Sequence, residues 1–600
     1  MWLASFYGRA LGLAFTMNHP IHTSSPDWRV SFSIRWLLLA VALVPLAFIG
    51  WISIVTYRDA PFWDEFSTTL SFLVQLHDSR SWREVIGLFV AADGQHCMVT
   101  SRAIFAAIYL LTGKINFITL AAIGNVAIVL GVAILAWQPR EVNLRLLYLA
   151  FLSLLIFQLQ HFENQLLSYA AIDHYLVIPL AAGSLVLWQR GTHWAAVGAA
   201  VLGLAAVFTA AQGLAVFLAG FSLLVWQRRW CVAWLWAAVA LGVAGFFVLT
   251  VDLGSTSGFR LTSLAAAAAA LRYWLTLLGS VPGLEHGVLS PGFGLLGLAS
   301  LVFLFYHGAT QREPVLGAFL IFVLGATALI AYGRFTLAQP QIAPRYFIQS
   351  AIFWATLGVL IIEMKVAPAR FWRMCLPVIG LVGIFNIVAT QRYLPVAERF
   401  FRQRLEAIRY YDKWLTLAGA PYALHPDPAL ADRVLKAAAQ RGIFRLQSRS
   451  SPPIAVRLPA KEMAMDYYLD EVSIGSGRIH IRGWMLPRGP WKDEYRPHLV
   501  FKAGDREFVF RGRRERRMDV AELYKRPEAE EVGFLFVIRR VELPPTELQV
   551  SLELRSTKQA IFTHTDHRIN NQENFNPAPF ATLPPSLWKP SRQIFIGVLP

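Results

Sequence analysis

Long apolar runs alternate with short polar segments through the first two thirds of the chain. A helix that crosses a membrane needs about 20 mostly apolar residues. One long stretch, 194–226, has arginines on both flanks, so we expect it to fold as a hairpin of two short helices. On these criteria the pattern predicts eleven spans, at residues 36–55, 115–137, 145–160, 172–188, 194–209, 212–226, 231–251, 291–306, 314–333, 347–364 and 374–390.

The segment between the first two spans, 56–114, is long but patterned. Apolar residues recur at helical spacing from Phe66 to Leu76, which indicates an amphipathic helix. Ser81 and Glu84 then have the spacing of a capping box, which marks the start of a second helix. A third helical stretch covers 101–112. We expect these pieces to lie flat on the outer membrane surface.

The pattern changes after residue 390. Residues 391–464 are predicted to be an external linker that begins with an amphipathic helix. From 465 to 567 the apolar residues recur every second position, as in "RIHIRGWML" and "VGFLFVIRR", which predicts a β-sandwich. The tail, 568–600, is rich in Pro and Asn and is expected to be extended. The predicted fold class is therefore a polytopic α-helical membrane protein (36–390) with a C-terminal all-β sandwich domain.

Composition agrees with a membrane protein, since 56% of the residues are hydrophobic and only 16% are charged, against about a quarter in soluble domains. The formal net charge of +17 does not indicate nucleic-acid binding, because much of the basic charge sits in short loops between apolar runs. The three cysteines are an odd number, and two of them fall within apolar runs. This placement argues against a disulfide framework.

The basic loops also predict an orientation, because cytoplasmic loops carry an excess of Lys and Arg. Arginines and Lys365 fall in alternate loops, which we take as cytoplasmic together with the N-terminal segment, 1–35. The C-terminal domain is then external, or periplasmic if the membrane is a bacterial inner membrane. The remaining loops are predicted to be external: 56–114, 161–171, 252–290 and 334–346.

Ionisable side chains near the apolar layer are functional candidates, because charge is expensive there. Loops far apart in sequence bring acids and arginines to the outer ends of the predicted spans, a composition suited to binding an anionic head group and activating a hydroxyl. The candidates are Asp64, Glu65, Asp93, His96, Arg102, Glu163, Asn164, Asp173, Arg334, Arg345 and Tyr346. The alternatives are structural: acids that favour a helix N-terminus, arginines that snorkel as interfacial anchors, and a histidine that is merely hydrogen-bonded.

The sequence "FWDEF" at 62–66 carries a resemblance to the integral-membrane glycosyltransferases of fold class C. In that superfamily an acidic residue directly after the first span is the catalytic base, which implies Asp64 here, with Glu65 as the alternate. One bacterial subset has a similar "FWD" start and then an Asn-Glu-His-Arg-like element. This chain has "DGQHCMVTSR", in which His96 and Arg102 match, whereas Gln95 and Cys97 depart from the expected Glu and Arg.

Further segments resemble the same subset: "FENQ" at 162–165 and "GRFTLAQPQIAPRY" at 333–346. The C-terminal strands, with "IRGWMLP", "RRMDVAELY" and "VGFLFVI", are similar to a small sandwich that accompanies bacterial glycosyltransferases. The resemblance covers roughly residues 36–400. It implies transfer of a sugar from a polyprenyl-phosphate donor, whose tail lies in the bilayer, to a glycan or lipid acceptor on the outer face of the membrane.

In that mechanism Arg334 and Arg345 would hold the donor phosphate, Tyr346 would add a hydroxyl donor, and Asp64 would accept the proton of the acceptor hydroxyl. Direct displacement would invert the anomeric centre. No cofactor is expected. A divalent cation near Asp64, Glu65 or Asp93 is left open, since no ligand set has a convincing spacing.

Two other classes of protein remain open on the sequence. One is a transporter or flippase for a lipid-linked or polar substrate, which would place ionisable groups near the middle of the membrane. The other is a non-enzymatic assembly protein with a glycan-binding sandwich.

Overall fold

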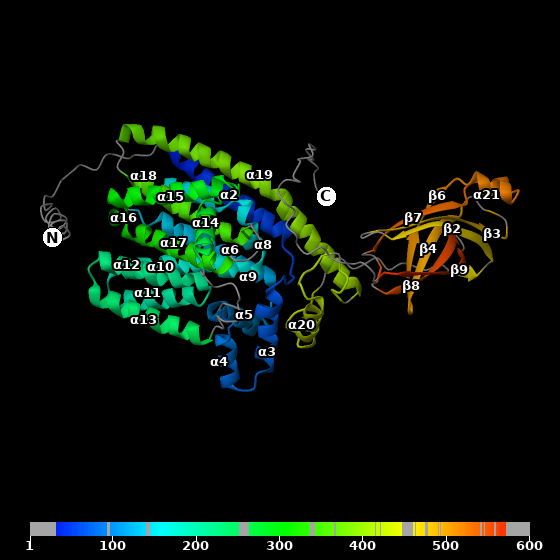
Figure 1. Ribbon diagram of the computed structural model, residues 1–600, viewed down its shortest axis with the longest axis horizontal. Helices are drawn as coiled ribbons and strands as arrows, with labels where there is room; N and C mark the ends of the chain where they lie inside the picture. The colour runs from blue at the N-terminus through cyan, green and yellow to red at the C-terminus, as the bar shows by residue number, and fades with distance from the viewer. Residues whose placement is uncertain are drawn as a thin grey trace.

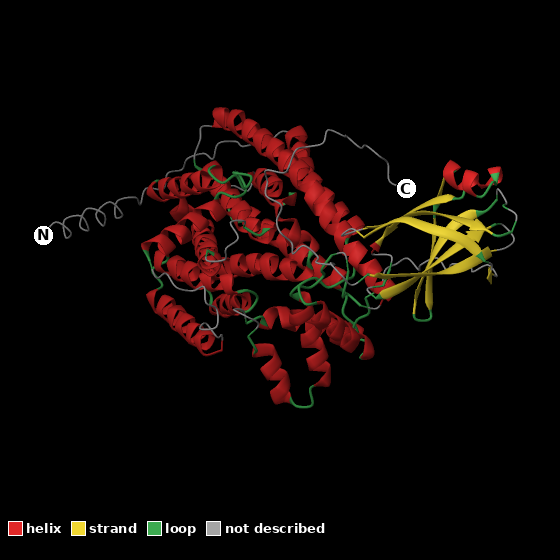
Figure 2. Cartoon of the chain, turned by 45° about the vertical axis from the view of Figure 1, so that its right-hand side comes forward, coloured by secondary structure: helices red, strands yellow, loops and turns green. Residues whose placement is uncertain are grey.

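The computed structural model shows a helical body followed by a separate β domain (Figures 1 and 2). In Figure 1 most long helices of the body run side by side along the horizontal axis, and the β domain lies beyond one end of the longest helix. The structure describes residues 32–92, 97–139, 144–250, 263–335, 342–364, 368–414, 416–420, 422–446, 460–462, 464–474, 478–489, 491, 494–540, 543–544, 546–556 and 560–571.

The first half of the helical body is built from apolar helices separated by short irregular turns. Two of its elements, η1 and η4, are single stretches of π-helix. In chain order the elements are α2 (Phe32–Thr56), η1 (Phe66–Ser71), α3 (Phe72–Asp78), α4 (Trp82–Val90), α5 (Val99–Thr112), α6 (Phe117–Ala136), α7 (Arg145–Ile156), η3 (Leu159–His161), α8 (Phe162–Leu166), α9 (Ser168–Ala170), η4 (Ala171–Leu176) and α10 (Val177–Arg190).

The second half of the body continues in the same way and ends with a helix of 47 residues, α19. Its elements are α11 (His193–Val207), η5 (Ala211–Leu214), α12 (Ala215–Trp226), α13 (Trp230–Thr250), α14 (Leu264–Leu278), α15 (Leu289–Tyr306), α16 (Ala309–Arg312), α17 (Pro314–Arg334), η6 (Pro344–Tyr346), α18 (Phe347–Glu363), α19 (Pro368–Trp414) and α20 (Pro428–Gln440).

Within the described residues, eight helices are long and apolar enough to cross a membrane, and a bent pair, α7 with η3 and α8, makes up to nine. The chain is therefore a membrane protein by the length and composition of its helices. The predicted hairpin within 194–226 is present as α11 and α12, which are too short to meet the same criterion. The predicted count of eleven spans stays a prediction, because it would need both short helices to cross.

Of two features predicted around the external segments, one differs from the pattern and one is confirmed. The predicted break between a last span at 390 and a linker helix at 391 is absent, because α19 runs unbroken through both and contains Pro377 and Pro395. The predicted capping box is confirmed: the Ser81 hydroxyl accepts from the backbone N–H of Glu84 at 3.3 Å. The Glu84 carboxylate accepts from the backbone N–H of Arg80, one residue before the cap.

Helices α3 and α4 lie across the direction of the long helices in both views (Figures 1 and 2). Their tip presents exposed apolar side chains, with Trp82 83% and Ile86 61% exposed. This geometry is compatible with the prediction that the first external segment lies along the membrane surface, where tryptophan is enriched.

The segment after α19 packs back on the helical body instead of forming a free linker. The Ile115 N–H donates to the Ile443 carbonyl at 2.9 Å, and the rings of Phe117 and Phe444 meet edge to face at 5.2 Å between centroids. Both phenylalanines are buried. Residues 416–446 are thus part of the helical body, next to the segment that joins α5 to α6.

The β domain consists of two sheets, as the period-two pattern predicts. One sheet has the order β1-β9-β8-β4-β5 and the other β2-β3-β7-β6, and all pairs are antiparallel except β1 with β9. The elements are β1 (Ala460–Glu462), β2 (Met465–Ile474), β3 (Arg478–Pro487), β4 (Arg496–Ala503), β5 (Arg506–Arg511), β6 (Arg513–Glu515), α21 (Met518–Leu523), η7 (Pro527–Ala529), β7 (Gly533–Arg539), β8 (Glu547–Arg555) and β9 (Ala560–Asn570).

Alternate residues of these strands form one core between the sheets. Ile481 of β3, Phe536 of β7, Phe501 of β4 and Val550 of β8 are all almost completely buried within it. Side chains on the other faces are largely charged, with surface ion pairs such as Arg482–Glu515. The domain therefore has its own hydrophobic core, as an independently folding unit requires.

The docking of residues 416–446 predicts a local stability effect. Phe444→Ala should lower the free energy of local opening of the α5–α6 connection by about 3–5 kcal/mol, because it leaves a cavity against Phe117. Hydrogen exchange of the amide of Ile115, in the protein reconstituted in lipid nanodiscs, measures this.

The control is Arg441→Ala, which removes an exposed ion pair with Asp78 and should leave the same free energy nearly unchanged. Equal effects of the two substitutions would contradict the packing described here.

Candidate functional site

Asp64 lies in the turn between α2 and η1, and its side chain is exposed. Its carbonyl accepts hydrogen bonds from Ser67 and Thr68, but its carboxylate makes no hydrogen bond or ion pair with any residue that the structure describes. The preceding residue, Trp63, has φ 48°, a left-handed conformation that costs a non-glycine residue about 1 kcal/mol or more. Its N–H donates to the Leu424 carbonyl at 2.7 Å. The turn is thus held in a strained shape that presents a free carboxylate.

Glu65, the adjacent acid, has the opposite environment and is completely buried. Its carboxylate accepts from the N–H of Phe62 at 2.6 Å, from the N–H of Tyr169 at 3.0 Å and from the hydroxyl of Ser168. Burial raises the pKa of the Glu65 carboxyl above its ordinary value, and the charge of Arg404 together with the three donors offsets that rise only in part. A carboxyl whose oxygens are already occupied is suited to holding the turn in place, so the geometry favours Asp64 over Glu65 as a base.

Arg404 brings α19 into the same cluster. Its guanidinium donates to the carbonyl of Ala60 at 2.7 Å and to that of Leu166 at 3.2 Å, and it lies over the rings of Phe62 and Phe400. The side chain is 5% exposed. Arg404 therefore ties the turn before Asp64, the α8–α9 segment and the long C-terminal helix to one another.

The α8 helix supplies the next part of the site. Glu163 accepts from the Arg345 guanidinium at 3.2 Å, with both side chains about one fifth exposed, at 18% and 24% respectively. The neighbouring Asn164 donates to the Arg345 carbonyl at 2.7 Å. Two loops separated by about 180 residues are thus joined by a side-chain ion pair and a hydrogen bond to the backbone, with Arg345 fixed at the start of α18.

Tyr346 forms a platform for two arginines. The guanidinium carbons of Arg345 and Arg334 lie 5.2 and 5.9 Å from the centre of its ring. The edge of the ring meets His174 of η4 at 5.4 Å, and the Nδ1 of that histidine lies 3.1 Å from the amide nitrogen of Gln212. Because that amide nitrogen is a donor, His174 Nδ1 accepts, and this hydrogen bond helps to hold the ring against Tyr346.

Arg334 differs from Arg345 in that it pairs with no acceptor among the residues that the structure describes. Its guanidinium lies over the Tyr346 ring. It is half-buried at the end of α17. A half-buried guanidinium that pairs with no described residue has donors available to an anionic ligand.

The sequence-predicted residues separate into those that meet and those that do not. Side-chain contacts join Glu163, Asn164, Arg345, Tyr346 and Arg334, and Glu65 ties its turn to the α8–α9 segment. Asp64 belongs to the same place only as the chain neighbour of Glu65, and Asp173 accepts from Ser101 on the neighbouring α5. Arg102 is engaged elsewhere, with its guanidinium donating to the carbonyls of Leu88, Phe89 and Ala91 and so closing the end of α4. Asp93 and His96 lie outside the described residues.

Three site residues were missed by the sequence analysis: Arg404, Tyr169 and His174. Arg404 belongs to a helix with many arginines, so nothing in its pattern sets it apart. Tyr169 and His174 lie in the α8–η4 turn, where an aromatic residue at the start of a span is ordinary. The π-helical segment η4 packs closely on α6. This close approach is possible because Gly124 of α6 has no side chain where it meets Ala171.

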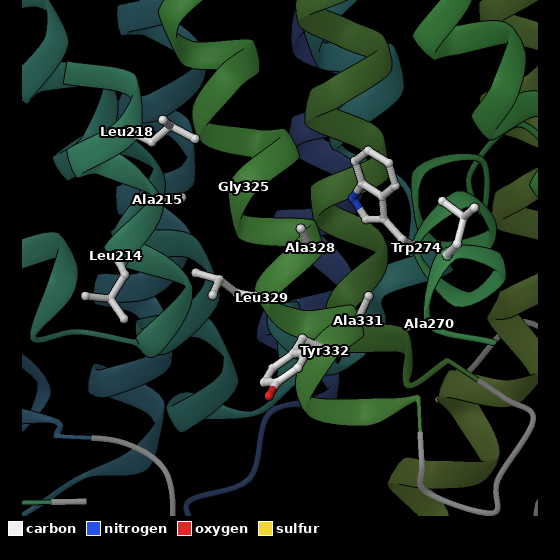
Figure 3. A pocket seen from close by; sticks show the side chains of 11 residues that line it. Leu214, Ala215, Leu218, Ala270, Trp274, Gly325, Ala328, Leu329, Ala331 and Tyr332 are labelled. Atoms are coloured by element: carbon white, nitrogen blue, oxygen red, sulfur yellow. The ribbon is translucent and has the colours of Figure 1, made fainter. Parts of the chain in front are cut away.

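An apolar groove of about 600 Å³ runs along α17 (Figure 3). Helices α12, α14 and α17 form its walls, with Leu218, Trp274 and Leu329 among the lining residues. Figure 3 shows Tyr332 at one end of the groove, two residues before Arg334. Trp274 of α14 lines the groove. The phenol of its chain neighbour, Tyr273, is close enough to Arg334 and Arg345 to be influenced by their charges.

Within the described residues there is no group of three or more His, Cys, Asp or Glu side chains arranged to hold a metal ion. No family model, curated protein or solved structure matches the chain. The cluster is therefore interpreted from its own chemistry.

The cluster predicts that Arg404 is a structural residue of the site. Arg404→Met should destabilise the turn around Asp64 by about 3–5 kcal/mol, because it removes the charge that faces buried Glu65 and leaves two carbonyls unpaired. Hydrogen exchange of the amides at residues 62–66 measures this change.

Arg402→Met is the matched control on the same helix. Its ion pair with Glu398 is exposed, so its loss should alter the exchange free energy by only about 0.3–0.5 kcal/mol. A small effect of Arg404→Met, similar to that of the control, would show that the buried arginine does not hold the turn.

Proposed function

We propose that this protein is a membrane glycosyltransferase that moves a sugar from a polyprenyl-phosphate donor to an acceptor hydroxyl at the outer face of the cytoplasmic membrane. The observation that carries the proposal is one arrangement. The turn that presents the unpaired carboxylate of Asp64 is tied through Glu65 to the α8–α9 segment, whose Glu163 pairs with Arg345. Arg334 lies at the end of α17, one of the walls of an apolar groove. Such an arrangement combines a base, an anion site and a place for a lipid. The resemblance of "FWDEF" to the class C glycosyltransferases agrees with it.

The donor phosphate is assigned to Arg334 and Arg345. Both guanidiniums lie over the Tyr346 ring, and the planar fork of arginine suits the oxygens of a phosphate. Arg345 is already paired with Glu163, so the free capacity comes mainly from Arg334. Two positive charges facing one negative carboxylate leave an excess of positive charge for the phosphate.

The polyprenyl tail is assigned to the groove between α12, α14 and α17. Its lining is almost entirely apolar and it follows a helix that is long enough to cross the membrane. A tail that moves from the bilayer into the groove exchanges one apolar environment for another, so van der Waals packing against the lining side chains would hold it. The tail would thus enter from the bilayer while the phosphate stays at the end of α17.

Asp64 is assigned the role of base. As the acceptor oxygen forms a bond to the anomeric carbon, the bond from that carbon to the phosphate oxygen breaks, and its electron pair leaves on the polyprenyl phosphate. The proton of the acceptor hydroxyl passes to the Asp64 carboxylate. Attack from the side opposite the leaving phosphate inverts the anomeric centre. A positioned base contributes roughly 10²–10⁴-fold, and stabilisation of the leaving phosphate by arginines supplies a further electrostatic contribution.

The acceptor is assigned only to a class, a glycan or lipid hydroxyl. Asp64 is exposed, whereas the arginines are half-buried beside the groove, so the acceptor would approach from the water side and the donor from the membrane side. A transporter would instead place its ionisable groups along a path through the middle of the bundle. The charges described here gather at the helix ends, which supports the transferase.

Replacement of Asp64 tests the base. Asp64→Asn should lower the rate of sugar transfer from polyprenyl-phosphate sugars in isolated membranes by roughly 10²–10⁴-fold while leaving donor binding unchanged. The assay uses a panel of radiolabelled donors and follows label into the acceptor fraction.

Asp78→Asn is the matched control, because Asp78 is an exposed acid of the same external segment whose partner is Arg441. This variant should retain the wild-type rate. If Asp64→Asn is expressed normally and transfers at the wild-type rate, Asp64 is not the base.

Filling the groove tests the assignment of the lipid tail. Ala328→Trp places an indole in the space between α12, α14 and α17, and should raise the Kd for undecaprenyl phosphate at least about tenfold. Val302→Trp, on the exposed surface of α15, is the control and should leave this Kd unchanged. Equal binding by both variants would place the tail elsewhere.

A further inference from the structure

We infer that Trp63 and His425 form an acceptor-binding surface beside Asp64, and that the acceptor they bind is a sugar ring. The inference rests on the proposed function and narrows its acceptor from a glycan or lipid hydroxyl to a hydroxyl of a sugar. The sequence analysis selected neither residue, and the resemblance assigns neither of them a role in binding.

The segment that follows α19 borders the turn that carries Asp64. The N–H of Trp63 donates to the Leu424 carbonyl at 2.7 Å. The rings of Phe66 and His425 meet at an interplanar angle of 63°, with 5.5 Å between their centroids. Two consecutive residues of this segment thus contact the residue before Asp64 and the residue two places after it. His425 is therefore fixed next to the turn of the proposed base.

The side chains of this turn divide into exposed and buried ones. Trp63 is 37% exposed and Asp64 is also exposed, whereas Glu65 and Phe66 are completely buried. The ring of His425 is partly exposed. The accessible surface at the turn therefore combines a carboxylate, an indole and an imidazole, while the adjacent buried side chains hold the turn in place.

Trp63 is held in a conformation that large residues rarely adopt. Its φ of 48° lies in the left-handed region, where a bulky side chain is an outlier. Such strain persists only where the surroundings enforce it, and it is concentrated at binding and catalytic sites. Here the hydrogen bond to the Leu424 carbonyl enforces it. The turn thereby keeps an indole exposed on the residue directly before the base.

One ring nitrogen of His425 is engaged and the other is available. Its Nδ1 lies 2.9 Å from the carbonyl oxygen and 3.0 Å from the backbone nitrogen of Asp427, so it either donates to the first or accepts from the second. Its Nε2 makes no hydrogen bond with any residue that the structure describes. In the first tautomer Nε2 is an acceptor, and in the second it is a donor. A hydroxyl group matches both, because it can donate and accept.

The indole favours a sugar ring over a lipid hydroxyl. A sugar has a face of C–H groups, which can pack on an aromatic ring, and a rim of hydroxyls. Aromatic side chains with a few placed polar groups are the usual lining of a site for such a ligand. One hydroxyl would lie at Asp64 and lose its proton there, as in the proposed transfer, while a second would bind Nε2 of His425. A diacylglycerol has neither the second hydroxyl nor the ring.

The experiment measures sugar transfer by the full-length protein in nanodiscs from the radiolabelled polyprenyl-phosphate donors. The sugar probes are the methyl glycosides of glucose, galactose, mannose and N-acetylglucosamine, and the lipid probe is dioleoylglycerol. We expect transfer to at least one methyl glycoside. Transfer to dioleoylglycerol alone, or only to water, would overturn the inference and leave a transferase. No release of label from any donor would count against the proposed function itself.

Two substitutions of His425 separate binding from packing. His425→Phe keeps a ring against Phe66 but has no nitrogen, and it should raise the KM for the methyl glycoside about 2- to 10-fold, with the KM for the donor unchanged. His425→Gln places an amide near the position of Nε2 and should restore most of the loss. The reverse ranking, with the Phe variant like wild type and the Gln variant impaired, would show that the ring only packs on Phe66.

Trp63→Leu tests the indole and should raise the same KM about 2- to 10-fold. Trp82→Leu is the matched control, because Trp82 is an exposed tryptophan of the same external segment. His286→Phe is the control for His425, because Nδ1 of His286 also contacts the backbone two residues on. Both controls should leave the KM unchanged. Equal effects of Trp63→Leu and Trp82→Leu would show that Trp63 does not bind the acceptor.

Discussion

The buried carboxyl of Glu65 is the constraint on which the site depends. It is out of contact with water, so its oxygens must be satisfied within the protein, and the donors come from two separate parts of the chain: its own turn at Phe62 and the α8–η4 turn at Ser168 and Tyr169. Arg404 of α19 adds a nearby positive charge and holds the Ala60 and Leu166 carbonyls. Moving any of these segments would leave a buried polar group unpaired, which costs about 1–3 kcal/mol or more. The adjacent residue, Asp64, is thereby held in position by the backbone, and its exposed carboxylate takes no part in holding the turn.

The same constraint explains why the last helix and the segment after it belong with the helical body. Arg404 lies 14 residues beyond the end of the last predicted span, in what the pattern describes as a linker. Two residues on either side of Asp64 contact the segment after the last helix. The N–H of Trp63 donates to the Leu424 carbonyl, and the ring of Phe66 packs against His425. Residues 422–446, which follow the last helix of the body, therefore form part of the wall behind the candidate site.

The sequence predicted the class of fold and the meeting of distant loops, and both for a physical reason. Long apolar runs have few stable states other than membrane helices, and alternating basic loops assign every second loop to one side, which brings Asp64, Glu163 and Arg345 to the same end. It did not predict which of two adjacent acids is buried, since "DE" has no internal pattern and burial depends on donors about 100 residues away. Nor did it predict that Arg102 closes the end of α4, because a capping arginine and a ligand-binding arginine look alike in sequence. Nor did the sequence show that α19 continues through residue 390. Pro377 and Pro395 lie inside this helix, although proline usually ends a helix.

The central claim is that one lipid phosphate occupies the space between Asp64 and the arginine pair, with its tail along α17. An experimental structure of the protein in nanodiscs with undecaprenyl phosphate tests it most directly. The account predicts density for the phosphate within hydrogen-bond distance of Arg334 and Arg345, and density for the tail between α12, α14 and α17. A phosphate bound elsewhere, or a tail that runs along other helices with the groove empty, would contradict it.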